Sequence, residues 1–417
     1  MRGMAWTALL FLAASAAPAH AYSVLTHEAL IDASWDEAIV PSLKKKFPEA
    51  SQADLSAARA YVYGGCIVQD MGYFPLGSKL FTDLVHYVRP DVFVTSMVEE
   101  AQDLDQYAFA LGALAHYAAD TRGHRLGINR AVPLLFKKLH KKYGDEVTYE
   151  DKPSAHLKTE FAFDVLQVAR GRYATQAYHD FIGFQVAKPV LERAFRRTYG
   201  LELSELFPNT DLAINTYRRT AGRIIPEATK LAWAVKGSEV EKAVPGATEQ
   251  AFVYRLRRVD YEKEWGTGYQ RPSVFARLGA FFVRILPKVG PLKALGFRMP
   301  TPEAEKLFEE SFTAAVDANV QLEKALRAGK LDLAPLNFDT GEPVPPGAYA
   351  LADRTWGDLV LKLEHAHFKD VPPELRMSIL DFYASDAPTQ GGERKERARQ
   401  RQLENALAEL RGLASLR

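Results

Sequence analysis

The sequence has almost no cysteine and almost no net charge. Its 417 residues include one cysteine, Cys66, so no disulfide can form within the chain. The formal net charge is +1, which falls to about zero without Arg2, the only charged residue before position 22. This balance excludes the general basic field that drives nonspecific binding to nucleic acid. The chain is 47% hydrophobic, so its stability must come from a large core and from any bound metal.

Strand-like alternation of apolar residues is also scarce, and only residues 92–96 show it weakly. Apolar residues at helical spacing are frequent instead, most clearly between Leu104 and Asp120. The pattern predicts helices over residues 28–46, 104–120, 155–172, 210–235, 303–329 and 354–383. We therefore expect an all-α fold, a multi-helix bundle with a C-terminal helical extension.

A long apolar run is missing as well. The run from Ala8 to Ala17 is too short to cross a bilayer as a stable helix. It follows Arg2 and precedes Ala19-His20-Ala21, which has small residues at the two positions that a signal peptidase checks. Residues 1–21 are thus predicted to be a signal peptide, and we expect a secreted or periplasmic protein.

Histidine and carboxylate residues form the most informative pattern. His116 precedes Asp120 by four residues, and His156 precedes Glu160 by four. On a helix, such a pair projects from one face about one turn apart. Imidazole nitrogen and carboxylate oxygen are the ligands of Zn²⁺ where thiolates are absent. The candidate side-chain ligands are His27, Asp70, His86, His116, Asp120, His124, His156 and Glu160.

Cleavage after Ala21 would add a further ligand. It would leave Tyr22 with a free α-amino group, which titrates near neutral pH and is available as a nitrogen ligand. The nitrogen and carbonyl oxygen of Tyr22 can chelate one ion together. His27, five residues later, is close enough in sequence to join it.

The ordered set resembles the zinc-dependent phospholipase C family, which shares a superfamily with the S1/P1-type nucleases. The family uses its amino-terminal residue, then His, Asp, His, His-x-x-x-Asp, His and His-x-x-x-Glu/Asp, around three zinc ions in a helical fold. The resemblance covers residues 22 to about 170. This chain has the same order in Tyr22, His27, Asp70, His86, His116, Asp120, His124, His156 and Glu160.

The resemblance also implies how the residues divide among three Zn²⁺ ions. One ion would take Asp70, His86, His116 and Asp120; the second Tyr22 and His27, with Asp120 bridging; the third His124, His156 and Glu160. The chain departs from the family in Tyr22, where Trp is usual, and in His124, which follows Asp120 by four residues instead of six. The step from Tyr22 to His27 is closer to the nuclease branch.

The function implied is hydrolysis of a phosphodiester. Asp70 would be a zinc ligand and the catalytic residue that orients or deprotonates the attacking water. The first hypothesis is a phospholipase C-like enzyme that releases phospholipid headgroups. The alternatives are a nuclease or other phosphodiesterase on the same zinc cluster, and a non-catalytic, metal-stabilised binding protein.

The rest of the chain is less informative. The segment from Arg271 to Arg298 is basic and aromatic and contains no acid, which fits contact with an anionic membrane interface or a hairpin packed on the core. We expect one helical domain over residues 22–330, a loop over 331–349, a helical segment over 350–385 and a charged tail over 386–417.

Overall fold

The computed structural model describes residues 22–173, 183–221, 225–248, 296–384 and 394–415. The predicted signal peptide lies outside the described residues, as do residues 271–295 of the basic segment. Arg298, at the end of that segment, donates a hydrogen bond of 2.8 Å to the carbonyl oxygen of Leu135 and lies over the ring of Phe136.

The fold is all-α, as the sequence predicts, and the described residues contain no strand. The first half comprises α2 (Val24–Ser34), η1 (Trp35–Ile39), α3 (Val40–Lys46), α4 (Gln52–Gly65), η2 (Val68–Tyr73), α5 (Lys79–Tyr87), α6 (Pro90–Glu99), α7 (Leu104–Arg122), η3 (Gly123–Ile128), α8 (Asn129–Leu135), α9 (Lys137–Tyr143) and α10 (Pro153–Ala169). The second half comprises α12 (Lys188–Tyr199), η5 (Leu203–Glu205), α13 (Thr210–Arg219), α14 (Ile225–Ala243), α18 (Pro302–Arg327), α19 (Ala350–Glu364), α20 (Pro373–Phe382) and α21 (Arg394–Ser415).

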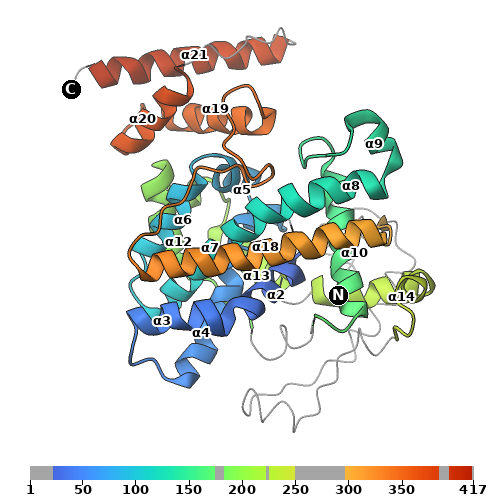
Figure 1. Cartoon of the computed structure of the whole chain (residues 1–417). Helices are drawn as coiled ribbons and strands as arrows, with labels where there is room; N and C mark the ends of the chain where they lie inside the picture. Colours follow the sequence, from blue (N-terminus) through green and yellow to red (C-terminus); the bar gives the residue numbers. More distant parts are fainter. Residues whose placement is uncertain (1–21, 174–182, 222–224, 249–295, 385–393, 416–417) are drawn as a thin grey trace, which may run out of the picture.

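Helix α7 is the centre of the bundle. Asp103 caps its first turn by accepting a hydrogen bond of 2.8 Å from the backbone N–H of Gln106. Every residue from Gln106 to Thr121 is buried, because α4, α6 and α18 pack around the helix. In Figure 1, α18 crosses in front of α7. The polar residues that α7 carries, His116 and Asp120, are therefore held in the interior.

The weak strand expected over residues 92–96 is wrong, since these residues lie in α6. Pro90 occupies the first turn of this helix, where its fixed φ suits the helix and its missing N–H costs nothing. Phe93, Val94 and Met97 then recur at helical spacing and are buried. Strand propensity in a short run is a weak preference, and packing overrides it here.

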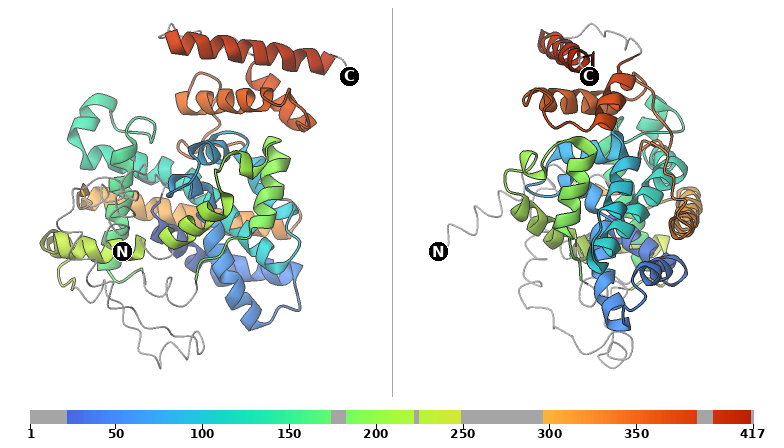
Figure 2. Two further views of the ribbon diagram at one scale, coloured as in Figure 1. Left: turned by 180° about the vertical axis from the view of Figure 1, so that it is seen from behind. Right: turned by 90° about the vertical axis from the view of Figure 1, so that its left-hand side faces the viewer.

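The C-terminal helices form a layer at one end of the molecule. Helix α19 packs against α5 on one side and α21 on the other, and Figures 1 and 2 show this stacking from three directions. The helix expected over 354–383 is divided into α19 and α20, because the intervening residues His367, Phe368 and Asp370 have positive φ. Within the described ranges, no helix has the length and apolarity needed to cross a membrane.

A buried polar contact joins α18 to the N-terminal helices. The Glu323 side chain is fully buried and accepts a hydrogen bond from the Ser42 hydroxyl. Arg327 donates to the Ser42 hydroxyl (3.0 Å) and to the carbonyl oxygen of Ala38 (2.8 Å). Burial raises the pKa of Glu323 from its usual 4.5 to about 8, although the Ser42 hydrogen bond acts in the opposite direction.

This shift predicts a pH dependence of stability. Between about pH 4.5 and 8 the folded protein keeps a proton on Glu323 that the unfolded chain loses, so stability falls as pH rises through this window. Glu323→Gln keeps a neutral partner for Ser42 at every pH. We therefore expect its free energy of unfolding to exceed that of the wild type at pH 8 by on the order of 1–3 kcal/mol, and to equal it at pH 4.5. Urea unfolding at both pH values measures this difference.

Glu310→Gln is the matched control, because Glu310 is an exposed acid on the same helix. It should reproduce the wild-type pH dependence. Equal losses of stability with rising pH in Glu323→Gln and the wild type would contradict the assignment of this effect to Glu323.

Candidate metal centre

The eight candidate side-chain ligands converge in the interior from six elements. They come from α2 (His27), η2 (Asp70), α5 (His86), α7 (His116, Asp120), η3 (His124) and α10 (His156, Glu160). Each is at most 4% exposed. Burying so many ionisable groups is costly unless each is paired or holds a metal.

Two of the groups they form share His116. One consists of His27, His116 and Asp120, and the other of Asp70, His86 and His116. The possible ligand atoms of each group lie within 4.8 Å of one another. The rings of His27 and His116 are stacked, with centroids 4.7 Å apart.

Asp120 lies between these two groups. Its Oδ1 is 3.5 Å from His27 Nε2, while its Oδ2 is 3.3 Å from His116 Nε2 and 3.5 Å from His86 Nε2. Burial opposes protonation of His86, but Asp120 and Asp70 outweigh it and raise the pKa of this histidine to about 10. Despite its burial, Asp120 has a pKa well below its usual value, because the three imidazoles surround it. The cluster therefore favours a bound cation, whether a proton or a metal.

The third group consists of His124, His156 and Glu160, whose ligand atoms also lie within 4.8 Å of one another. His156 Nδ1 is 3.7 Å from Glu160 Oε1, and the two histidine rings have centroids 5.7 Å apart. Burial lowers the pKa of His156 to about 4, so its imidazole is neutral at pH 7 and keeps a lone pair for a metal.

Backbone carbonyl groups orient four of the histidines. Because a carbonyl oxygen only accepts, the ring nitrogen beside it must carry the proton, and the other nitrogen is left to bind a metal. The pairs are His86 Nδ1 with Thr82 O (2.9 Å), His116 Nδ1 with Cys66 O (2.9 Å), His124 Nδ1 with Phe338 O (3.0 Å) and His156 Nε2 with Val147 O (2.5 Å). The opposite nitrogens are the ones that face the carboxylates and the other histidines of the groups.

These residues fit zinc. Zinc–ligand distances of roughly 2.0–2.2 Å place two ligands of one ion no more than about 4.4 Å apart, close to the separations within each group. The donors are nitrogen and oxygen only, which zinc accepts. In the described part of the chain, the buried His124 Nε2 and His156 Nδ1 make no hydrogen bond, which is the state expected of metal ligands.

The position of His124 follows from the continuation of α7 into the π-helix η3. Single π turns within helices are frequent at functional sites. This turn carries His124 to the side where α10 presents His156 and Glu160. The shortened spacing after Asp120 is therefore compatible with the third group.

Tyr22 is fixed beside the same cluster. Its hydroxyl lies 2.7 Å from Ser311 Oγ, and its ring meets the His27 ring edge-on at 6.0 Å. Gly123 makes room for this ring, since a Cβ atom there would lie 2.7 Å from it. The backbone of Tyr22 is thus held where α2 begins.

Asp164 fixes the start of α2. It accepts hydrogen bonds from Leu25 N (3.3 Å) and Thr26 Oγ1 (2.8 Å), which satisfies the first turn of the helix from outside it. Burial raises the pKa of Asp164 to about 7. Its role is to hold the N-terminal segment.

The loop between α18 and α19 also contributes to the site, which the sequence did not predict. The Phe338 ring is fully buried against His86 and His116, at centroid distances of 5.1 and 5.8 Å. The next residue, Asp339, is 1% exposed and lies 3.6 Å from His124 Nδ1. No motif in this segment indicated such a role.

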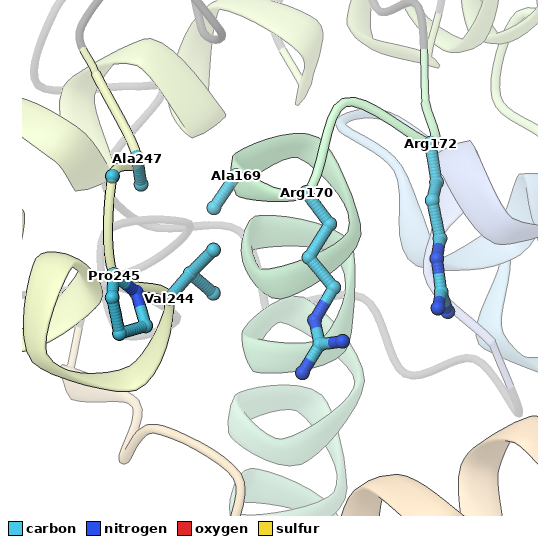
Figure 3. Close-up of a pocket in the computed structure, with 7 residues that line it drawn as sticks. Ala169, Arg170, Arg172, Val244, Pro245 and Ala247 are labelled. Carbon is cyan, nitrogen blue, oxygen red and sulfur yellow. The ribbon is translucent and has the colours of Figure 1, made fainter.

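A pocket of about 380 Å³ lies elsewhere, at the C-terminal end of α10 (Figure 3). It is lined by Ala169, Arg170, Arg172, Val244, Pro245, Gly246 and Ala247. Arg170 and Arg172 form ion pairs with Glu305 and Glu309 of α18. None of the candidate ligands lines this pocket.

An all-α bundle with buried histidine and carboxylate groups on several helices is the arrangement in which helical bundles hold metal ions. The family model of zinc-dependent phospholipase C matches residues 26–209. This match confirms the family that the ordered motifs indicate. No curated protein and no solved structure matches the chain.

His116 lies at the junction of two of the three groups and has one nitrogen, Nε2, left for a metal, so its removal should cost one of the two neighbouring ions. We expect His116→Ala to lose at least one zinc ion per chain, measured by elemental analysis of the folded protein. His140→Ala is the control, because His140 is an exposed histidine on α9 that pairs with Asp145. Equal zinc content in His116→Ala and the wild type would contradict the proposed ligand set.

Proposed function

We propose that this protein is a zinc-dependent phospholipase C-like hydrolase that releases phospholipid headgroups. The observation that carries the proposal is the convergence of three buried histidine–carboxylate groups within the segment matched by the family. We further propose one ion per group, three in all, with Tyr22, His27 and Asp120 around one of them.

The chain's own residues have distinct roles in this proposal. Bound zinc ions would lower the pKa of a water molecule and neutralise charge on the phosphoryl oxygens. Asp70, buried on η2 and 3.3 Å from His86 Nε2, orients the attacking water and accepts its proton at the carboxylate. Asp120, whose oxygens lie beside His27, His86 and His116, would bind zinc between these histidines and offset part of its charge.

The proposal includes export and processing. Cleavage after Ala21 would free the amino group of Tyr22, whose side chain is already fixed beside His27. The mature protein would then act outside the cytoplasm, where its basic segment from Arg271 to Arg298 meets an anionic bilayer surface.

A nuclease on the same centre would need aromatic side chains on which bases can stack. Of the four aromatic residues that flank Asp70, Tyr63, Tyr73 and Phe74 are at most 8% exposed, and Tyr61 is partly buried. The burial of three of these four rings favours the phospholipid substrate over the nuclease alternative.

Parallel assays of the zinc-loaded protein distinguish the substrate classes. We expect headgroup release from phosphatidylcholine vesicles that contain an anionic phospholipid, its loss on chelation, and no cleavage of single-stranded DNA. Cleavage of DNA alone would favour the nuclease, and silence in both assays with zinc bound would favour a metal-stabilised binding protein.

Asp70→Asn tests the role of the carboxylate. We expect kcat for headgroup release to fall by about 10²–10⁴, the usual contribution of a positioned proton acceptor, with zinc content measured on the same sample. Asp36→Asn, an exposed acid on η1, should retain wild-type activity. Full activity in Asp70→Asn would rule out this role.

Residues fused in front of Tyr22 test the processed amino terminus. An added Gly-Ser dipeptide converts its amine into an amide, which is a poor metal ligand, so we expect zinc content and activity both to fall. The same dipeptide at the C-terminus should change neither. Unchanged zinc content in the N-terminal fusion would show that the amine is not a ligand.

A further inference from the structure

A turn far from the matched segment crosses the metal centre. Phe338 accepts a hydrogen bond from His124 Nδ1 (3.0 Å) through its carbonyl oxygen. Its N–H donates to the carbonyl oxygen of His86 (3.4 Å). The turn therefore contacts His86, which belongs to the group of Asp70 and His116, and His124, which belongs to the third group. It lies outside residues 26–209.

The position of this turn is fixed by its own hydrogen bonds. Asn337 Oδ1 accepts from the backbone N–H groups of Asp339 (2.9 Å) and Thr340 (3.1 Å), and Gly341 N–H donates to the Asn337 carbonyl (2.8 Å). Gly341 has a φ of +65°, and a Cβ atom there would lie 2.2 Å from the carbonyl oxygen of Thr121. The turn thus sits tightly against the end of α7.

Asp339 places a buried carboxylate behind His124. Its Oδ1 lies 3.6 Å from His124 Nδ1 and makes no hydrogen bond within the described residues. Its Oδ2 accepts from Tyr149 N (2.9 Å) and from the Tyr349 hydroxyl (2.5 Å). Asn129 Nδ2 donates to its main-chain carbonyl at 2.7 Å. The carboxylate is therefore held in one orientation, with one oxygen directed at the imidazole.

The same carboxylate supports His156. The carbonyl oxygen of Val147 accepts a hydrogen bond of 2.5 Å from His156 Nε2. Tyr149 lies two residues after Val147 in the chain. The Tyr149 ring also meets the His156 ring edge-on, with centroids 6.2 Å apart. By binding Tyr149 N, Asp339 fixes the short segment that orients His156.

We propose that Asp339 is a positioning residue for the third metal group, acting on His124 directly and on His156 through the 147–149 segment. The Phe338 carbonyl already favours the proton on His124 Nδ1, and the negative charge of Asp339 beside it strengthens this preference, so that Nε2 carries the lone pair. The hydrogen bond to Tyr149 N keeps His156 Nδ1 directed toward Glu160. The inference rests on the proposed binding of zinc by this group.

Asp339→Asn changes the charge and little else. Its amide oxygen can still accept from Tyr149 N and Tyr349, while its NH₂ group faces the protonated Nδ1 of His124 as a second donor. Loss of a carboxylate partner of a metal-binding histidine typically weakens metal binding by about 10–100-fold. We expect this weakening for one zinc ion per chain, with the other ions held as in the wild type.

Competition with a chromophoric zinc chelator measures each affinity in wild-type protein, Asp339→Asn and Asp332→Asn. Asp332 is an exposed acid of the same loop, and its variant should match the wild type. The ¹⁵N signals of the His124 ring in metal-free protein report which nitrogen carries the proton. We expect the proton on Nδ1 in the wild type and a larger share of it on Nε2 in Asp339→Asn, where only the Phe338 carbonyl still favours Nδ1. Loss of packing alone would not produce this change.

The outcomes separate the two proposals. Zinc bound by the wild type with equal affinity in Asp339→Asn overturns the role of Asp339 and leaves the proposed function intact. Absence of zinc from the wild type overturns the proposed function and this inference with it. If Asp339→Asn does not fold, Tyr349→Phe is the second variant, because it removes only one hydrogen bond to the carboxylate. It should lower the affinity for the same zinc ion by a smaller factor. Wild-type affinity in this variant would also overturn the inference.

Discussion

The buried carboxylate of Asp120 is the constraint around which the centre is built. Three imidazoles from α2, α5 and α7 approach its two oxygens at 3.3–3.5 Å, and no part of it is exposed. Such a concentration of ionisable groups is unfavourable in an apolar interior without a cation to compensate it. The surrounding helices must therefore hold these side chains against their tendency to separate or to reach water.

The bundle meets this requirement by orienting ligands through backbone groups. Carbonyl oxygens from α4–η2, α5, the loop before α10 and the α18–α19 loop each bind one nitrogen of a histidine ring. These contacts select a tautomer without adding charge, which suits a site already rich in carboxylates. The core packing that places the helices also sets the direction of each metal-binding nitrogen.

The C-terminal half contributes to a centre whose candidate ligands all lie in the N-terminal half. Helix α18 packs along α7 and η3 and contacts Tyr22 through Ser311, and the loop after it carries Phe338 and Asp339 into the site. Specificity and metal retention can therefore depend on residues outside the family match. In the proposed hydrolase, α18 and the loop after it, which lie outside the family match, thus form part of the site.

The sequence alone determined that His116 and Asp120 share one face, and that His156 and Glu160 share another. A spacing of four residues places two side chains on the same face of any helix. The sequence also determined the all-α fold, through apolar periodicity, but not residues 92–96, where packing in α6 outweighed strand propensity. Only the tertiary structure decided that the turn at Phe338 and Asp339 joins the site. Its main contact is a backbone carbonyl, which every residue type provides, so no sequence pattern marks it.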